Sequence, residues 1–444
     1  MTLKTRLRLI LLRVEDDFRY SRRVRAMLAW LSWWRGRMVR REDSKIRHFT
    51  KAFGLAETPG TWRRIMRSLV PLLNSTREPV WRQVVATNSR YATLLREKPH
   101  LTRSVVLKAP GLDGEKGLLL NYFEYNLARV LSLSDADLAW LDRRYHLVFV
   151  ASWSPTDYAL LGSALLRLES PLFIQCANEA ERGKLAAFHP RLVCLPGLAC
   201  DWVDPAFYQP KPYGDRSIDL LMVANWGAFK RHWEFFAALR DLPGDLRVVL
   251  IGQKEGGRSK EFITRLAREI GVPQKLELFE SLTIEQVTDL QCDARVSVIL
   301  SRREGGCVAA VESLFAGCAL AMRSDAIIGS SAHINPQTGR HLRPGHIAGD
   351  LGALLAECEV LKPREWVRDE IQNEITLARI NMRVQEHALA VGQPWKNNLA
   401  VPHWRPHPTI ANEADRERLR LAYAELHEKF PTLVGVDLIE QSHR

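Results

Sequence analysis

The alternation of apolar and polar residues changes along the chain and predicts two α/β domains between helical end regions. Residues 1–100 carry helical patterns without clear strands. Short β-branched runs alternate with helix-like segments over 101–210 and again over 211–362, and a proline-rich linker at 204–217 separates the two series. The pattern is helical again over 363–444. Since strands that alternate with helices form parallel sheets, we expect two Rossmann-like domains facing a cleft, with helical extensions at both ends.

The expected strands are short apolar runs that end at turn residues. In the first domain they are VVLKA (105–109), HLVFVAS (146–152), LFIQC (172–176) and RLVCLPG (191–197), and in the second they are DLLMVAN (219–225), RVVLIG (247–252), LELFESL (276–282), VSVILS (296–301) and CALAM (318–322). Helix-like segments, such as LLLNYFEYNLARVL (118–131), separate them. Ligands of such sheets lie beyond the carboxyl ends of the strands, and candidate chemistry is therefore expected there.

The charge of the chain is concentrated at its N-terminus. The net charge is +12, and residues 1–41 hold one Lys and eleven Arg against three acids, a net charge of +9. These arginines are interleaved with leucine and tryptophan, which suits an amphipathic helix on an anionic membrane surface. The same helix could instead pack its apolar face on the body of the protein. Nucleic-acid binding is a third interpretation, but no recognised motif supports it, and we do not expect a nucleic-acid partner.

Composition restricts the class of protein. The chain has 444 residues, 46% of them hydrophobic and 26% charged, which is typical of a soluble protein with a large core. The seven cysteines are scattered, without the spacing of a zinc site, so we expect a reduced compartment and no metal. No stretch approaches the roughly 20 apolar residues of a spanning helix. We therefore expect a cytoplasmic protein, with peripheral contact at the inner face of a membrane left open.

The stretch SRREGGCVAAVESLFAGC (301–318) lies where a ligand site belongs. A buried strand ends in a Gly-Gly loop, and a helix follows whose free N–H groups suit a phosphate. The glutamates that flank this loop could accept hydrogen bonds from a vicinal diol. Two glutamates eight residues apart are common by chance, so the prediction depends on the strand-loop-helix context. Its members are Glu304, Gly305, Gly306, Cys307 and Glu312.

Four segments together resemble the group 1 retaining glycosyltransferases of GT-B fold. The stretch at 301–322 resembles their E-x7-E signature, and VANWGAFKRHWEFFAAL (223–239) resembles their first strand and lysine-bearing helix start. LPGLACDWVDPAFYQP (195–210) resembles the segment that closes the family's first domain, and NPQTGRHLRPGHIAGDLGALLAE (335–357) resembles the tail of its second domain. The resemblance covers 190–360 well and the first domain loosely, so the chain is expected to be a divergent member.

The resemblance implies a role for each matching residue. Glu312 would bind the ribose of a nucleotide, Glu304 would contact the transferred sugar, and Lys230 would offset charge on the departing diphosphate. Main-chain N–H groups over 305–307 would cradle the phosphates. The family has an arginine before the lysine, where this chain reads Asn225-Trp226-Gly227. The candidates for the second positive charge are Arg231, Arg302 and Arg303, and the sequence does not choose among them.

The first domain offers weaker candidates on the acceptor side. APGLDGEKGLLL (109–120) follows a predicted strand and is expected to open a helix, and its glycines Gly111, Gly114 and Gly117 would let the backbone approach a ligand. A simple β-to-α turn explains the same residues. In SWSPTD (152–157), Thr156 and Asp157 are expected to cap the next helix.

The resemblance implies a metal-independent hexosyltransferase. It would use a nucleotide sugar as co-substrate, without a cofactor, and transfer the sugar with retention to a glycan, lipid-linked or other acceptor. The basic, tryptophan-bearing N-terminus favours an acceptor of bacterial cell-surface polysaccharide or glycolipid biosynthesis. The missing arginine leaves open a catalytically decayed GT-B protein that binds sugar nucleotides or acts as a scaffold. A sugar-nucleotide epimerase of similar shape is a further alternative, but it needs an acid/base residue that the sequence does not reveal.

Overall fold

The computed structural model describes residues 3–75, 78–88, 91, 104–403 and 409–440. The chain forms two compact units, the first of Met1–Phe18 and Cys200–Gln372 and the second of Arg19–Ala199 and Asn373–Arg444. This division differs from the predicted one, because the helical ends belong to the two α/β units rather than standing apart. The unit boundaries fall at 199 and 372 rather than 210 and 362, and the predicted boundary at 100 lies outside the described residues.

The first unit contains a parallel sheet of six strands. The strands stand in the order β11-β10-β9-β6-β7-β8. Numbered along the chain and read from β8, this is the 3-2-1-4-5-6 order of a doubly wound fold. All six strands are parallel, and the order in which they are added to the sheet reverses between β6 and β9. The bounds are β6 Ile218–Val223, β7 Val248–Gly252, β8 Leu276–Glu280, β9 Ala294–Ile299, β10 Ala319–Arg323 and β11 Gly339–Leu342. The five predicted strands are confirmed, and β11 is an edge strand that the sequence analysis missed.

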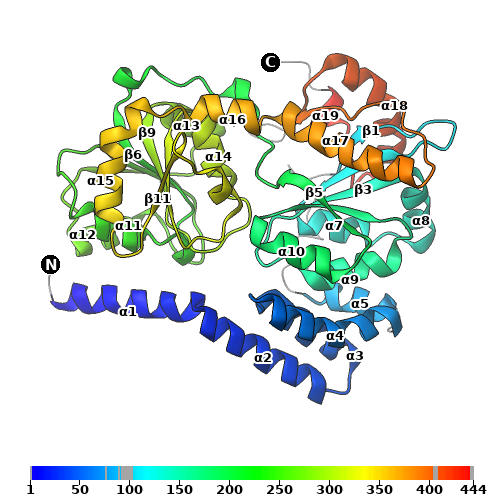
Figure 1. The fold of residues 1–444 in the computed structure, drawn as a ribbon. Helices are drawn as coiled ribbons and strands as arrows, with labels where there is room; N and C mark the ends of the chain where they lie inside the picture. Colours follow the sequence, from blue (N-terminus) through cyan, green and yellow to red (C-terminus); the bar gives the residue numbers. More distant parts are fainter. Residues whose placement is uncertain (1–2, 76–77, 89–90, 92–103, 404–408, 441–444) are drawn as a thin grey trace. The chain divides into compact units, whose positions relative to one another are not determined.

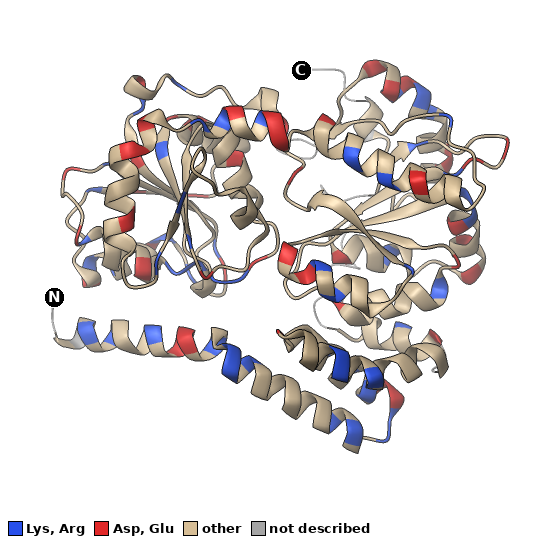
Figure 2. Ribbon diagram, viewed as in Figure 1, with Lys and Arg blue, Asp and Glu red and all other residues tan. Residues whose placement is uncertain are grey.

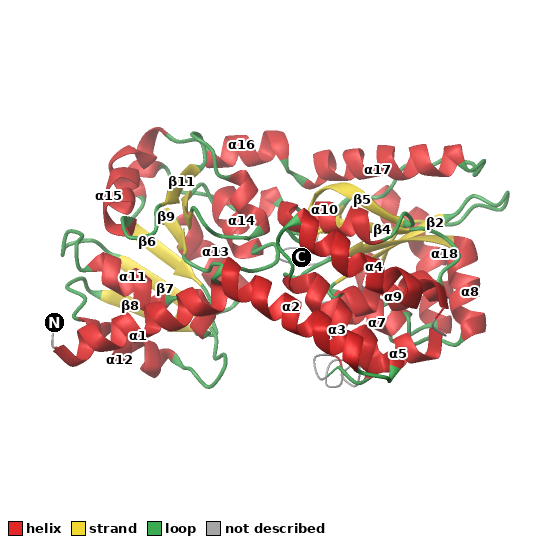
Figure 3. Ribbon diagram, turned by 60° about the horizontal axis from the view of Figure 1, so that its bottom comes forward, coloured by secondary structure: helices red, strands yellow, loops and turns green. Residues whose placement is uncertain are grey.

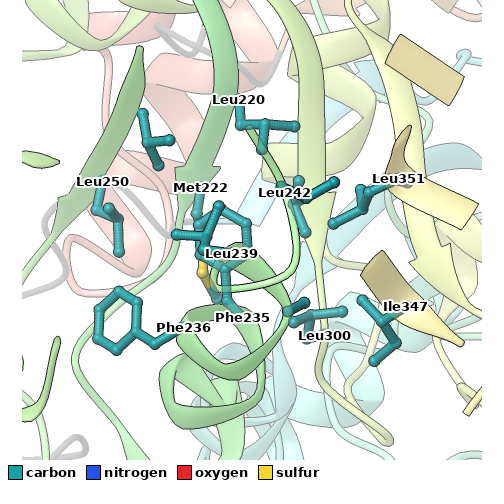
Figure 4. Packing of buried hydrophobic residues seen from close by; sticks show 14 of the residues in the cluster. Leu220, Met222, Phe235, Phe236, Leu239, Leu242, Leu250, Leu300, Ile347 and Leu351 are labelled. Carbon is teal, nitrogen blue, oxygen red and sulfur yellow. The ribbon is translucent and has the colours of Figure 1, made fainter. Parts of the chain in front are cut away.

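Helices cover this sheet (Figure 1). Right-handed crossovers place helices on both faces when the strand order reverses. Three of them, α11, α12 and α15, share one hydrophobic core with the strands, which Figure 4 shows around Phe235 and Leu351. The helices of this unit are α11 His232–Leu239, α12 Lys260–Ile270, α13 Ile284–Cys292, α14 Val308–Phe315, α15 Ile347–Glu357, α16 Pro363–Glu370 and α1 Leu3–Tyr20, of which α1 belongs here as far as Phe18.

The second unit contains a five-stranded sheet in sequential order, with strands drawn in yellow in Figure 3. Strands β2 to β5 are parallel, and β1 pairs antiparallel with β2. The predicted helix at 118–131 is wrong in its first part, because 117–122 form a buried strand and the helix begins at Glu124. A short apolar run does not distinguish a strand from a buried helix. The bounds are β1 Ser104–Lys108, β2 Gly117–Tyr122, β3 Tyr145–Val150, β4 Leu172–Cys176 and β5 Leu192–Leu198.

The helices of the second unit form layers on this sheet. Since the parallel strands follow one another in order, right-handed crossovers place their connecting helices on one face. The C-terminal helices α17 and α18 contact β5 and β1, and α3, α4 and α5 pack on α9 and α10. The bounds are α2 Arg22–Met38, α3 Glu42–Leu55, α4 Pro59–Ser75, α5 Glu78–Ala86, α7 Glu124–Val130, α8 Asp135–Arg144, α9 Tyr158–Arg167, α10 Glu179–Phe188, α17 Asn373–Ala390, α18 Glu413–Lys429 and α19 Asp437–Glu440.

No helix in the described part of the chain is long and apolar enough to cross a membrane.

Candidate functional site

Two charged residues meet at the point where the strand order of the first unit reverses. Lys230 ends a short turn after β6, and Glu304 lies in the loop after β9. The Lys230 Nζ donates hydrogen bonds to both carboxylate oxygens of Glu304, at 2.7 Å each. Their side chains are only 12% and 13% exposed. The structure therefore brings together the two residues that the sequence predicted for one site, and it pairs them with each other.

The electrostatics of this pair keep the lysine charged. Burial disfavours the ammonium of Lys230, but the Glu304 carboxylate and Cys307 together outweigh burial, so the pKa of Lys230 lies above its ordinary value. An anionic ligand that reaches this lysine would therefore meet a cation that already has a partner. Such a ligand has to compete with Glu304 for the ammonium group.

The loop after β9 is fixed by backbone hydrogen bonds to a second loop. The N–H of Glu304 donates to the carbonyl of Ile327, and the carbonyls of Gly305 and Gly306 accept from the N–H groups of 329 and 330. A Cβ on Gly306 would lie 2.9 Å from the Cβ of Cys200, so only glycine fits there. None of the hydrogen bonds between described residues uses the N–H groups of 305–307. These groups directly precede α14, and N–H groups at the start of a helix can bind an anion.

Cys307 shows which charges surround this loop. It adopts a left-handed conformation, with φ of 55°, at the start of α14. Burial, followed by the carboxylate of Glu304, raises the pKa of its thiol to about 12; Lys230 opposes this shift and Glu312 adds to it. The thiol therefore stays protonated at neutral pH and is a poor nucleophile. Glu312 itself lies on α14 and is 6% exposed, so both predicted glutamates are near the Gly-Gly loop.

The loop after β6 holds its residues for structural reasons. The carboxamide oxygen of Asn225 accepts from the N–H of Gly227 at 3.2 Å. Trp226 is fully buried, and its indole Nε1 donates to a carboxylate oxygen of Glu280 at 2.6 Å. A Cβ on Gly227 would lie 2.7 Å from the ring of Phe229. Sequence reasoning missed the Trp226–Glu280 contact, which fixes the turn that ends at Lys230.

Two of the candidates for the missing arginine are paired with carboxylates of α1. Arg231 is 2% exposed and forms ion pairs with Glu234 and with Asp16 of α1. Arg302 pairs with Asp16 at 3.0 Å and with Asp17 at 2.8 Å. Both guanidinium groups thus have carboxylate partners, and their roles toward a phosphate stay predictions. Their network joins three arginines to four carboxylates, namely Arg231, Arg302 and Arg323 with Asp16, Asp17, Glu234 and Asp325.

Arg303 is the third candidate for the missing arginine, and the acidic residues at 15–17 include partners that the sequence analysis did not predict. Arg303 pairs through its backbone with Ile327, and its role toward a ligand stays a prediction. The acidic run at 15–17 is the only one in the basic first 41 residues. That isolation was a signal for an internal ion pair, although the sequence could not name its partners.

Three buried side chains near the same loop could coordinate a metal. Cys200, Asp201 and His333 place their ligand atoms within 4.8 Å of one another. The carboxylate of Asp201 lies 2.8 Å from the His333 Nε2 and 3.4 Å from the Cys200 Sγ. These hydrogen bonds satisfy the three side chains among themselves. The cluster therefore ties the 200–201 segment to the 329–333 turn without requiring an ion.

The glycine loop of the second unit lies away from the expected edge. The segment 109–116 is the turn of the β1–β2 hairpin, in which Gly111 N–H donates to the carbonyl of Glu115 and Gly114 has φ of 84°. A Cβ on Gly117 would lie 2.5 Å from the carbonyl oxygen of Lys108. Because β1 is antiparallel to β2, this turn is at the amino ends of β2–β5. The expectation that the loop opens a helix at the ligand edge is wrong.

The carboxyl ends of β2 and β3 instead hold a buried acid. The carboxylate of Glu124, fully buried, accepts hydrogen bonds from the N–H groups of Ser152 and Trp153 and from the hydroxyl of Ser152. Burial raises the pKa of Glu124 from 4.5 to about 7, although these hydrogen bonds oppose the shift. In the same segment Asp157 caps α9 by accepting from Ala159 N and Leu160 N, as predicted.

The buried Glu124 predicts a pH dependence of stability. Between pH 4.5 and about 7 the unfolded chain releases this proton while the folded chain keeps it, so stability falls as pH rises through this window, by up to about 3 kcal/mol. Urea unfolding of the wild type and of Glu124→Gln at pH 5 and pH 8 measures the effect. The variant is expected to gain stability relative to the wild type at pH 8, and Glu428→Gln, at an exposed site, is expected to follow the wild type. Parallel pH curves for all three proteins would contradict the assignment.

No protein-family model and no curated protein matches this chain. TarM is 12% identical over 62% of this chain and 55% of its own, with a TM-score of 0.45. A sucrose-phosphate synthase from Thermosynechococcus elongatus is 13% identical over 76% of this chain and 80% of its own, with a TM-score of 0.46. WaaG, a glycosyltransferase involved in lipopolysaccharide biosynthesis, is 12% identical over 56% of this chain and 78% of its own, with a TM-score of 0.39.

The matches are partial. The matched part spans 50% of one TarM chain and 55% of another. Such likenesses assign no activity. The strand orders themselves show two α/β units, of which the first has the doubly wound order, and the chemistry of the site rests on its residues.

Proposed function

We propose that the first unit binds a nucleotide-activated sugar and that the protein transfers this sugar to an acceptor with retention of configuration. The observation that carries the proposal is the Lys230–Glu304 pair beside the Gly-Gly loop, at the reversal point between β6 and β9. Ligands of doubly wound sheets bind at this point. A cation, a carboxylate and unused N–H groups together suit a phosphorylated sugar.

Each group in the site has a task in the proposed reaction. The N–H groups over 305–307 and the ammonium of Lys230 stabilise charge on the departing diphosphate. Once a phosphate attracts Lys230, Glu304 is released to accept hydrogen bonds from the sugar. Glu312 accepts hydrogen bonds from the ribose. This division of charge needs no metal ion or cofactor, and the departing phosphate takes the proton of the acceptor hydroxyl.

The acceptor is proposed to be a glycan or lipid-linked glycan of a bacterial cell surface, made at the cytoplasmic face of a membrane. The support for this class is the basic, apolar segment 1–41, which suits an anionic lipid surface.

A binding protein without turnover is the second candidate. It is favoured by the commitment of Arg231 and Arg302 to ion pairs, which leaves Lys230 to face a diphosphate without either of them. Measuring nucleotide-sugar binding and sugar transfer separately distinguishes the two. Binding without transfer to any glycan acceptor would favour this alternative.

A thermal-shift screen against UDP-, GDP-, ADP-, TDP- and CMP-sugars tests the proposal. One class of nucleotide sugar is expected to raise the melting temperature, because a ligand that binds the folded state stabilises it. Glu312→Gln, which keeps the shape of the side chain, is expected to weaken that ligand about tenfold or more through loss of charged hydrogen bonds. Glu357→Gln, on the exposed side of α15, serves as the control. A screen without any stabilising ligand, or equal affinity in both variants, would contradict the donor site.

A further inference from the structure

Exposed apolar side chains are concentrated on the first two helices. In the described part of the chain, eighteen large apolar side chains are exposed, and eleven of them lie on α1 and α2. Six belong to α1 and recur at helical spacing, so that they form one stripe. These residues, called the α1 stripe below, are Leu3, Leu7, Ile10, Leu11, Val14 and Phe18, with exposed fractions from 53% to 74%. A soluble helix normally turns such a stripe toward a core.

The opposite face of α1 already holds the helix on the first unit. The hydroxyl of Thr5 donates to the carbonyl of Glu269, and Arg8 pairs with the carboxylate of the same residue. Leu9 and Leu12 pack against the core of this unit. Asp16 closes the contact by pairing with the arginines after β6 and β9. The stripe therefore faces away from the unit on which α1 is fixed.

The charges of α1 complement an anionic surface. Asp16 is occupied by internal ion pairs and Asp17 pairs with Arg302, whereas Arg6 and Arg13 are exposed along one side of the stripe. Figure 2 shows Lys and Arg repeated along α1 and α2. A helix with an apolar face and basic flanks binds in the plane of a lipid interface, with its cations among the headgroups. The length of the stripe, about 24 Å, suits this orientation.

We propose that the α1 stripe inserts into the interface of a bilayer containing anionic lipids while Asp16 and Asp17 hold α1 on the first unit. This inference deepens, and rests on, the membrane contact proposed for residues 1–41. It assigns the contact to one helix and one face, and it makes the unit carrying Lys230 and Glu304 the one that α1 attaches to the membrane. A soluble donor would then be used beside a lipid-bound acceptor.

Vesicle sedimentation of the full chain tests this proposal. The wild type, an α1 variant (Leu7→Glu/Ile10→Glu/Val14→Glu) and a control variant (Leu389→Glu/Val391→Glu/Leu421→Glu) are compared on phosphatidylcholine vesicles with and without phosphatidylglycerol. Both variants replace three exposed apolar side chains and change the charge equally. The wild type and the control are expected to bind the anionic vesicles, and the α1 variant to bind at least about tenfold more weakly.

Several outcomes would overturn the proposal. The proposal is overturned if both variants bind equally well, if the wild type does not bind, or if the wild type binds neutral and anionic vesicles equally well. If light scattering shows a wild-type oligomer that the α1 variant dissociates, the stripe contacts a second copy instead, and the proposal is also overturned. Nucleotide-sugar binding by the α1 variant is measured in parallel and is expected to be unchanged. If the wild type binds vesicles but no nucleotide sugar, the result counts against the donor site rather than the membrane contact.

Discussion

Lys230→Ala is expected to lower the rate of sugar transfer about a hundredfold to a thousandfold. The ammonium group of Lys230 follows β6 and lies beside the Gly-Gly loop, whose residue Glu304 it contacts. Without it the charge on the departing diphosphate loses its strongest partner in the reaction, while substrate binding loses less. The effect is measured as kcat and KM for the nucleotide sugar that stabilises the protein most.

A matched lysine and a double variant control this result. Lys254→Ala changes an exposed lysine, 74% exposed, in the loop after β7 and is expected to retain full activity. Lys230→Ala also leaves Glu304 unpaired at a site where its side chain is only 13% exposed, so the stability of the protein is expected to fall. The double variant Lys230→Ala/Glu304→Gln is expected to recover stability but not sugar transfer. Full transfer by Lys230→Ala would refute the role given to this residue.

Arg231→Met is expected to destabilise the first unit by about 3–5 kcal/mol, because removing one partner of a buried ion pair leaves uncompensated charge. Arg231 is 2% exposed and connects Glu234 of α11 to Asp16 of α1. The loss follows from the network, in which four carboxylates already face three arginines. Urea unfolding followed by tryptophan fluorescence measures it.

The control and the readout separate a structural from a catalytic role for Arg231. Arg268→Met, at an exposed position of α12, is expected to change stability by less than about 0.5 kcal/mol. If Arg231 instead contacted the diphosphate, Arg231→Met would lower kcat in a protein of wild-type stability. That result would reinstate the arginine as the missing family residue and contradict its structural assignment.

The first unit was predictable in most of its parts. Strands β6 to β10 are buried runs between clear turn residues, so their periodicity was enough to locate them. Lys230 and Glu304 each follow such a strand, and the rule that ligands lie at carboxyl ends placed them at one edge. That they pair at 2.7 Å depends on the order of the strands, which periodicity does not contain.

The errors have physical causes of the same kind. The run at 117–122 is apolar throughout, and nothing local distinguishes it from the helix that begins at Glu124. Consequently the glycine loop before it was assigned to the wrong end of the sheet. Arg231 and Arg302 both form ion pairs with Asp16, which lies more than 200 residues away along the chain. Contacts of that range follow from the fold and not from local sequence.

The most direct test of the central claim is a crystal structure of the protein with the nucleotide sugar that stabilises it. Diphosphate density is expected at the carboxyl ends of β6 and β9, within hydrogen-bonding distance of the N–H groups of 305–307 and of the Lys230 Nζ. Glu304 is also expected to leave the lysine, and Arg231 and Asp16 are expected to stay paired. A diphosphate bound elsewhere, with the Lys230–Glu304 pair intact, would contradict the account.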